Sequence, residues 1–309
     1  MKNQNDDFKV KLIPFIKNCE VNHIKKIPYG IEMIQAKNMW NKSNMGEGIN
    51  IGIIDSGCDI EHESLKDNIV FVRNFTDEDK KNPNIVEDRV GHGTHVAGII
   101  AANGVNNKII GVAPLANLYI LKAIDRTGSG KVSWVINAIN YAIEKKVDII
   151  SMSLGMRNDD PKLEKAIKNA INNNIIVVCA AGNEGDGNAD NFEYSYPASY
   201  IDVISVGAVD KKAIPASFSN SNLVVDLVAP GVDIVSTYPN NQFASLSGTS
   251  MAAPHITGSL ALLKNWSRQE FQRDLTQEEI YAQLIKYTKN LGYPKTVQGN
   301  GLVYLKDRK

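Results

Sequence analysis

The sequence predicts an α/β fold with a mostly parallel central sheet and helices on both faces. Apolar runs rich in Ile and Val alternate with runs of helical period from residue 48 onward. The apolar runs are continuous, which is typical of strands covered on both faces. Strand–helix alternation favours parallel strands with helices packed on each side.

Six apolar runs are the expected strands. In a parallel sheet ligands bind beyond the carboxyl ends of the strands, so the residues that follow each run are candidates for chemistry. The runs are Ile49–Ile54, Asn117–Ile124, Val147–Ser153, Ile175–Ala180, Val203–Val209 and Val224–Val228.

Helix signals lie between these runs. Asp160 and Pro161 begin a segment whose apolar stripe continues to Ile171. Residues 132–143 carry a second stripe. Thr276 and Glu279 have the spacing of a capping box, which predicts a helix that starts there.

Composition excludes some classes of partner. The 309 residues contain 34 Lys and Arg against 34 Asp and Glu, so no net charge favours nucleic acid or an anionic membrane. No apolar stretch reaches the roughly 18 residues that span a membrane. Three cysteines without a C-x-x-C, and a polar N-terminus without a signal-like apolar run, predict reduced thiols and a cytoplasmic location.

Four polar residues stand where these elements begin or end. Asp55 follows the first strand, and Asn183 follows the strand Ile175–Ala180. His92 opens a small-residue helix and is a candidate general base. Ser250 precedes the apolar helix 251–263, whose N-terminus offers N–H groups to a developing oxyanion.

Each of these signals is weak when taken singly. A lone Asp or Asn after a strand is usually a turn residue, and a serine among small residues can mark a close helix contact. His92 and His95 could suggest a metal, but no third His or Cys lies near them and the chain has no H-E-x-x-H, which argues against zinc.

In combination and in this order, the four residues resemble the subtilisin-like serine proteases, the subtilase family. The resemblance covers residues 28–305, and Cys58, residues 178–187 and Leu12–Phe15 resemble the intracellular subtilisins of bacteria. The motifs that carry it are Ile54–Gly57, Gly91–Gly98, Ser151–Gly155, Ala180–Gly185 and Gly248–His255.

The resemblance implies a subtilisin-like three-layer fold and a serine endopeptidase. Ser250 would be the nucleophile, His92 the general base and Asp55 the residue that orients it. The Asn183 amide and the Ser250 N–H would form the oxyanion hole. No organic cofactor is implied.

The resemblance also implies that a protein or peptide substrate binds as an extended strand, with broad side-chain selectivity. Glu184 would lie near the mouth of the primary specificity pocket. The two walls of the cleft would be Ser153, Leu154 and Gly155 on one side and Gly128, Ser129 and Gly130 on the other.

Departures from the family pattern concern metal binding and assembly. Two ligand positions of the family's tight calcium site hold Ser64 and Val105, which should weaken Ca²⁺ binding. Asn103, Asn106 and Asn107 are near enough to compensate, so the resemblance leaves a Ca²⁺ ion possible. Asp210 matches a second, weaker cation position. The tail after Leu305 is short, which weakens the expectation of a tail-assisted homodimer.

We divide the chain into an extension, residues 1–24, and a peptidase domain, residues 25–309. The extension is either a disordered tail or an inhibitor. As an inhibitor, Leu12, Ile13 and Phe15 would occupy apolar subsites. Pro14, which lacks an N–H, would interrupt strand pairing and lift the chain off Ser250.

Two other functions compete with a broad endopeptidase. A non-catalytic regulator with the subtilase fold would be expected to have lost Asp55, His92 or Ser250, and all three are present. A dedicated processing protease for one proprotein or leader peptide would keep the same triad, so the sequence leaves that alternative open.

Overall fold

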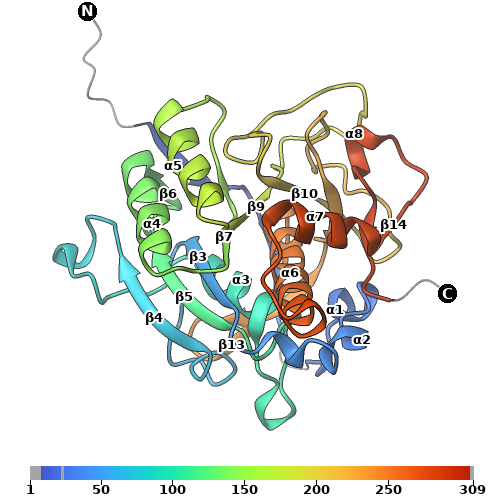
Figure 1. Ribbon diagram of the computed structural model, residues 1–309. Helices are drawn as coiled ribbons and strands as arrows, with labels where there is room; N and C mark the ends of the chain where they lie inside the picture. The colour runs from blue at the N-terminus through green and yellow to red at the C-terminus, as the bar shows by residue number, and fades with distance from the viewer. Residues whose placement is uncertain (1–7, 22–23, 307–309) are drawn as a thin grey trace, which may run out of the picture.

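The computed structural model describes residues 8–21 and 24–306. Within residues 24–306 the central sheet has nine strands in the order β14-β15-β11-β10-β9-β7-β3-β5-β4, and all neighbours except β14 and β15 are parallel (Figure 1). The strands are β3 (Asn50–Asp55), β4 (Ile69–Asn74), β5 (Asn117–Lys122), β7 (Ile149–Met152), β9 (Ile176–Ala180), β10 (Ile204–Val209), β11 (Leu227–Pro230), β14 (Thr288–Lys289) and β15 (Leu302–Val303).

The predicted α/β class is confirmed, and five of the six expected strands lie within a residue or two of their predicted ends. The expected strand Val224–Val228 is displaced, because β11 begins at Leu227. Asn222 Oδ1 accepts a hydrogen bond from Val224 N at 2.9 Å, so the first half of that apolar run forms a turn.

Helices cover both faces of the sheet (Figure 1). One face packs against α4 (Val132–Glu144) and α5 (Pro161–Asn172), and the other packs against α3 (His92–Ala101) and α6 (Thr249–Phe271). Further helices are α1 (Tyr29–Met33), α2 (Lys37–Trp40), α7 (Gln277–Lys286) and α8 (Lys295–Gln298). The predicted capping box at the start of α7 is present.

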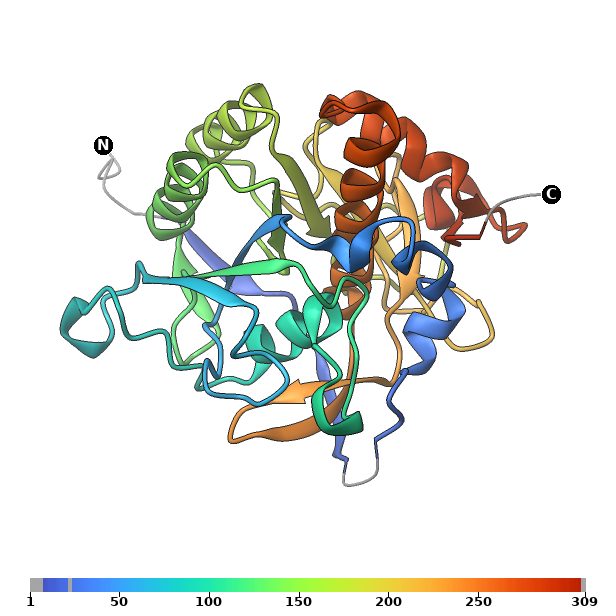
Figure 2. The same cartoon turned by 60° about the horizontal axis from the view of Figure 1, so that its bottom comes forward.

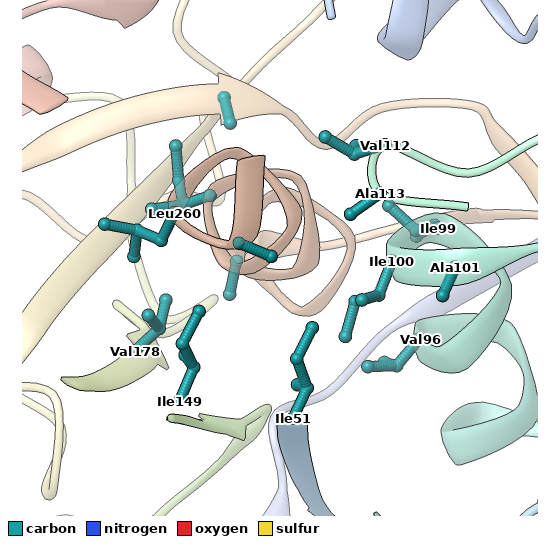
Figure 3. Packing of buried hydrophobic residues seen from close by; sticks show 14 of the residues in the cluster. Ile51, Val96, Ile99, Ile100, Ala101, Val112, Ala113, Ile149, Val178 and Leu260 are labelled. Carbon is teal, nitrogen blue, oxygen red and sulfur yellow. The ribbon is translucent and has the colours of Figure 1, made fainter. Parts of the chain in front are cut away.

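Side chains of each strand alternate between the two layers. Ile51 and Ile53 of β3 join the cluster around α6, whereas Ile54 joins the cluster beneath α4 and α5. Figure 3 shows Ile51, Ile149 and Val178, from three neighbouring strands, gathered around α6. This core fixes the positions at which β3, α3 and α6 begin and end.

Two small antiparallel sheets flank the central one, and each includes a strand from the N-terminal segment. β1 (Lys9–Leu12) lies between β6 (Ser129–Lys131) and β8 (Leu154–Gly155). β2 (Ile16–Glu20) is the outer strand beside the hairpin of β12 (Ile234–Tyr238) and β13 (Gln242–Ser247). Figure 2 shows this dark blue segment running from the green helices to the orange hairpin.

None of the helices in the described ranges is both long and apolar enough to cross a membrane.

Candidate active site

Asp55 is the last residue of β3, and its carboxylate is almost completely buried. Its Oδ1 atom accepts a hydrogen bond from Ser56 N at 2.7 Å and lies 2.8 Å from His92 Nδ1. The strand end therefore fixes the carboxylate, which in turn fixes the orientation and tautomer of the imidazole ring.

His92 is the first residue of α3 and is fully buried. It follows Gly91, whose φ of +86° belongs to the left-handed region that favours glycine. In the described part of the chain, His92 Nε2 has no hydrogen-bond partner. The ring of Phe15 covers the imidazole, with 4.9 Å between ring centroids.

His95 has a structural role. Its Nε2 lies 3.0 Å from the Ile234 carbonyl oxygen and 3.1 Å from that of Ala244, so it donates to the β12–β13 hairpin. Burial lowers its pKa to about 3, which keeps the ring neutral. The zinc alternative for His92 and His95 finds no support in these contacts.

Ser250 is the second residue of α6 and follows the cap residue Gly248 by two positions. Its N–H is therefore among the N-terminal helix groups that lack an intrahelical acceptor. Its Oγ lies 3.5 Å from the carbonyl oxygen of Ser153, and Ser153 Oγ donates to the Ser250 carbonyl at 3.2 Å. The hydroxyl thus faces Ser153, and the bond to His92 Nε2 is not formed.

Asn183 follows β9 and is held by the start of α6. Its Oδ1 accepts hydrogen bonds from Thr249 N at 2.9 Å and from Thr249 Oγ1 at 2.7 Å, which turns its Nδ2 outward. That Nδ2 donates to the carbonyl oxygen of Pro14. An amide fixed in this way can stabilise negative charge on a carbonyl oxygen.

β6 and β8 line a cleft beside these groups, and β1 fills it. Lys9 and Val10 pair with Lys131 and Gly130, and Lys11 pairs with both Ser129 and Gly155. Leu12 N donates to the Gly128 carbonyl at 2.9 Å, and Ile13 N donates to the Ser153 carbonyl at 3.4 Å. The two predicted walls of the cleft therefore bind one extended strand between them.

Comparisons with known proteins agree with this geometry. A model of the subtilase family matches residues 46–301. The chain is 50% identical to the major intracellular serine protease of Bacillus subtilis over 96% of its length and 93% of that protein. It is 51% identical to an intracellular serine protease of Paenibacillus polymyxa, over 96% of this chain and 91% of that protein. It is 39% identical to subtilisin E of Bacillus subtilis, over 82% of this chain and 66% of that protein.

The chain belongs to the subtilase family. It is a subtilisin-like serine endopeptidase, as the sequence predicted. The serine endopeptidase function predicted from Asp55, His92 and Ser250 is therefore confirmed. Its substrates are proteins or peptides.

The arrangement can carry out acyl transfer to Ser250. The serine oxygen attacks the carbonyl carbon, His92 Nε2 takes its proton, and the same nitrogen returns it to the leaving amine. Asp55 stabilises the imidazolium that forms in between. The Asn183 Nδ2 and the Ser250 N–H would stabilise the oxyanion. For this, Ser250 Oγ must turn from Ser153 toward His92.

A subtilase cleaves after the residue that fills its primary specificity pocket. A cavity of about 300 Å³ is lined by Ile13, Gly155, Met156 and Glu184, among others. Ile13 is 2% exposed and lies against Gly155. Glu184 also lines this cavity, and its place at the mouth of the primary specificity pocket stays a prediction.

Sequence reasoning missed two residues that support the site. Asp88 is buried, and its Oδ1 accepts from Ser56 Oγ and Gly91 N, both at 2.8 Å. An acidic residue shortly before a helix start was the signal for it. Val10 is fully buried in the cleft, and its spacing of two from Leu12, on one face of a strand, was the signal there.

The residues at the predicted metal positions have ordinary structural contacts. Asp210 Oδ1 accepts from Lys212 N at 2.8 Å and Ile214 N at 2.9 Å, which makes it a turn residue. Among the described residues, no group of three or more His, Cys, Asp or Glu side chains is placed to hold a metal ion. Ser64 and Val105 provide no carboxylate, so weakened Ca²⁺ binding stays a prediction.

Proposed function

We propose that this endopeptidase is kept inactive by its own residues 8–20, which occupy the substrate cleft. The observation that carries the proposal is the hydrogen bond from Asn183 Nδ2 to the Pro14 carbonyl. A carbonyl at that position excludes the carbonyl of a substrate from the oxyanion hole. Phe15 over the His92 ring closes the cleft further.

The same contacts explain how the segment could resist cleavage. Ile13 lines the cavity with Gly155 and Glu184 that we take as the primary specificity pocket, whereas the carbonyl on Asn183 belongs to Pro14. Cleavage requires one residue to provide both, because the reacting carbonyl must be aligned with Ser250 and the oxyanion donors at once. Pro14 has no N–H to continue the ladder and its φ is fixed, so it can impose this offset of one residue.

Burial of apolar side chains would hold the segment in place. Val10, Leu12 and Ile13 are 0%, 7% and 2% exposed. Each such side chain contributes roughly 1.5–3 kcal/mol when fully buried. This gain offsets part of the entropy lost when the segment is ordered, and the backbone hydrogen bonds of β1 add to it.

The specificity we propose is broad, because the cleft contacts its strand through the backbone of β6 and β8. The dedicated processing protease remains the alternative. Digestion of unfolded casein separates the two, since a broad enzyme cuts at many sites. The names of two relatives favour an intracellular enzyme. Calcium binding and a homodimer stay predictions.

The test is to remove residues 1–24 and measure hydrolysis of a small peptide substrate. We expect activity well above that of the full-length chain, which fluorophosphonate labelling of Ser250 should match. A full-length Leu12→Asp, Ile13→Asp variant serves as a second route, in case the shortened chain does not fold. Equal activity of wild type and the folded double variant would contradict autoinhibition.

A further inference from the structure

β2 is the part of the N-terminal segment that follows Pro14, and it shows the path of a polypeptide beyond the oxyanion hole. Its residues pair antiparallel with β13, the strand that leads directly to Gly248 and Ser250. The ladder starts beside the catalytic serine and extends away from it, and Val21 N adds a bond to the Phe243 carbonyl at 2.9 Å. The pairs are Ile16 with Ser247, Lys17 with Leu246, Cys19 with Ser245 and Glu20 with Ala244.

A bulge in this ladder directs one side chain into a polar pocket. The register shifts between Ser245 and Leu246, which leaves Asn18 as the extra residue on β2. Asn18 Nδ2 donates to Asp233 Oδ1 at 2.5 Å and to Ser247 Oγ at 2.9 Å. Asp233 N also donates to Ser247 Oγ at 2.8 Å, so the pocket is held together without Asn18.

The preceding residue lies over an aromatic ring. Lys17 Nζ is 4.3 Å from the ring centroid of Tyr238 and also 3.2 Å from Glu20 Oε1. The Tyr238 ring is fixed, because its hydroxyl donates to the Val90 carbonyl at 3.3 Å and a Cβ atom at Gly91 would come within 2.3 Å of the ring. A fixed ring face attracts a cation through its quadrupole.

We propose that the edge of β13, with Asp233 and Tyr238, is a substrate-binding surface for the part of a polypeptide that follows the cleaved bond. At one substrate position it selects a Lys or Arg, whose cationic group lies on the face of the Tyr238 ring. At the next position it selects a side chain with N–H donors for the Asp233 carboxylate. The proposal rests on the proposed function, because it takes β2 as a stand-in for substrate. It deepens that function by naming the substrate class: long, extended chains with basic or amide side chains there.

Strand addition explains why length matters. A chain whose carbonyl lies on Asn183 passes Gly248 and then meets β13, which offers backbone groups along six residues. Each ladder bond adds a modest net gain, and several together should raise kcat/KM by about tenfold. A substrate that ends two residues after the cleaved bond cannot gain it.

The test uses the full-length chain with Leu12→Asp and Ile13→Asp, which should release the segment from the cleft. Its substrates are internally quenched peptides that are identical before the cleaved bond. One peptide ends two residues after that bond and another six residues after it. In a series of long peptides, the pair Lys-Asn is placed at successive positions between the second and the fifth residue after the cleaved bond. Each peptide is compared with one that has Glu-Asp at the same place. We expect kcat/KM to be about tenfold higher for the long peptide and several-fold lower when the acidic pair replaces Lys-Asn.

Two variants on this background assign the effect to the surface. Asp233→Asn and Tyr238→Leu should reduce the preference for Lys-Asn, and Asp202→Asn and Tyr293→Leu are matched controls at exposed positions away from β2. A long-to-short ratio near one, or a Lys-Asn preference that both surface variants leave intact, would overturn the proposal. If the double variant is no more active than wild type, autoinhibition fails, and the same ratios measured on wild type still decide this inference.

Discussion

The two halves of the N-terminal segment bind the same catalytic centre in different ways. β1 alternates between exposed and buried residues and is paired on both sides, whereas all five residues of β2 are exposed and are paired on one side. Apolar burial therefore anchors the half before Pro14, while backbone pairing and two polar contacts guide the half after it. From this difference we infer that inhibition depends mainly on β1, whereas β2 determines the direction in which the chain leaves the catalytic centre.

The largest effect on inhibition is expected from a charge in the β1 half. Val10→Asp places a carboxylate in a site that is 0% exposed and apolar, and an unpaired buried charge costs several kcal/mol, so the segment should leave the cleft instead. We expect fluorophosphonate to label Ser250 about 100-fold faster than in wild type. Lys11→Asp, at an exposed position of the same strand, is the control, and equal rates for the two variants would place the anchor elsewhere.

Removal of the proline between the halves should turn the inhibitor into a substrate. In Pro14→Ala the added N–H and freed φ allow the chain to align one residue with both the primary specificity pocket and Asn183. We expect self-cleavage near residue 13 on a time scale over which wild type stays intact, measured by mass spectrometry. Pro14→Ala with Ser250→Ala is the control that should not be cut. A Pro14→Ala chain that also stays intact would show that the offset is not what protects the segment.

A change in the β2 half should have a smaller effect. Asn18→Ala removes hydrogen bonds to Asp233 and Ser247 at an exposed site, and such bonds contribute about 1 kcal/mol. Labelling of Ser250 should therefore accelerate by less than tenfold. Acceleration as large as that of Val10→Asp would contradict the division of roles.

The smallest effect is expected from a change outside both halves, at His255, which is a buried residue of α6. Burial lowers the pKa of His255 to about 4 from 6.5, so the unfolded chain binds the extra proton first as pH falls. That stability is present above pH 6.5 and is lost progressively between about pH 6.5 and 4. His255→Gln should flatten the slope of unfolding free energy against pH by at most one proton, about 1.4 kcal/mol per pH unit, in urea titrations. An unchanged slope would mean that His255 does not carry this proton.

The sequence predicted the centre of the molecule better than its edges. Asp55, His92, Asn183 and Ser250 follow strong apolar runs or open helices, so local pattern and chain order located them. The small strands β1, β2, β6 and β8 carry no such pattern, because their pairing joins residues more than a hundred positions apart. Only the resemblance of Leu12–Phe15 indicated where the segment binds.

Some features depend on geometry that no sequence pattern specifies. The proposed offset depends on which residue of the segment brings its carbonyl to Asn183, and this residue is Pro14 and not Ile13. The contact of Asn18 with Asp233 depends on a bulge in β2. The turn that displaced β11 depends on the single side chain of Asn222.

Hydrogen exchange of the full-length Ser250→Ala protein tests the central claim, that residues 8–20 fill the cleft, most directly. The amides of Leu12 and Ile13, which donate to the Gly128 and Ser153 carbonyls, should exchange slowly. Val10→Asp in the same background should make both exchange fast while the core strand β3 stays protected. Fast exchange of Leu12 and Ile13 without Val10→Asp would contradict the account.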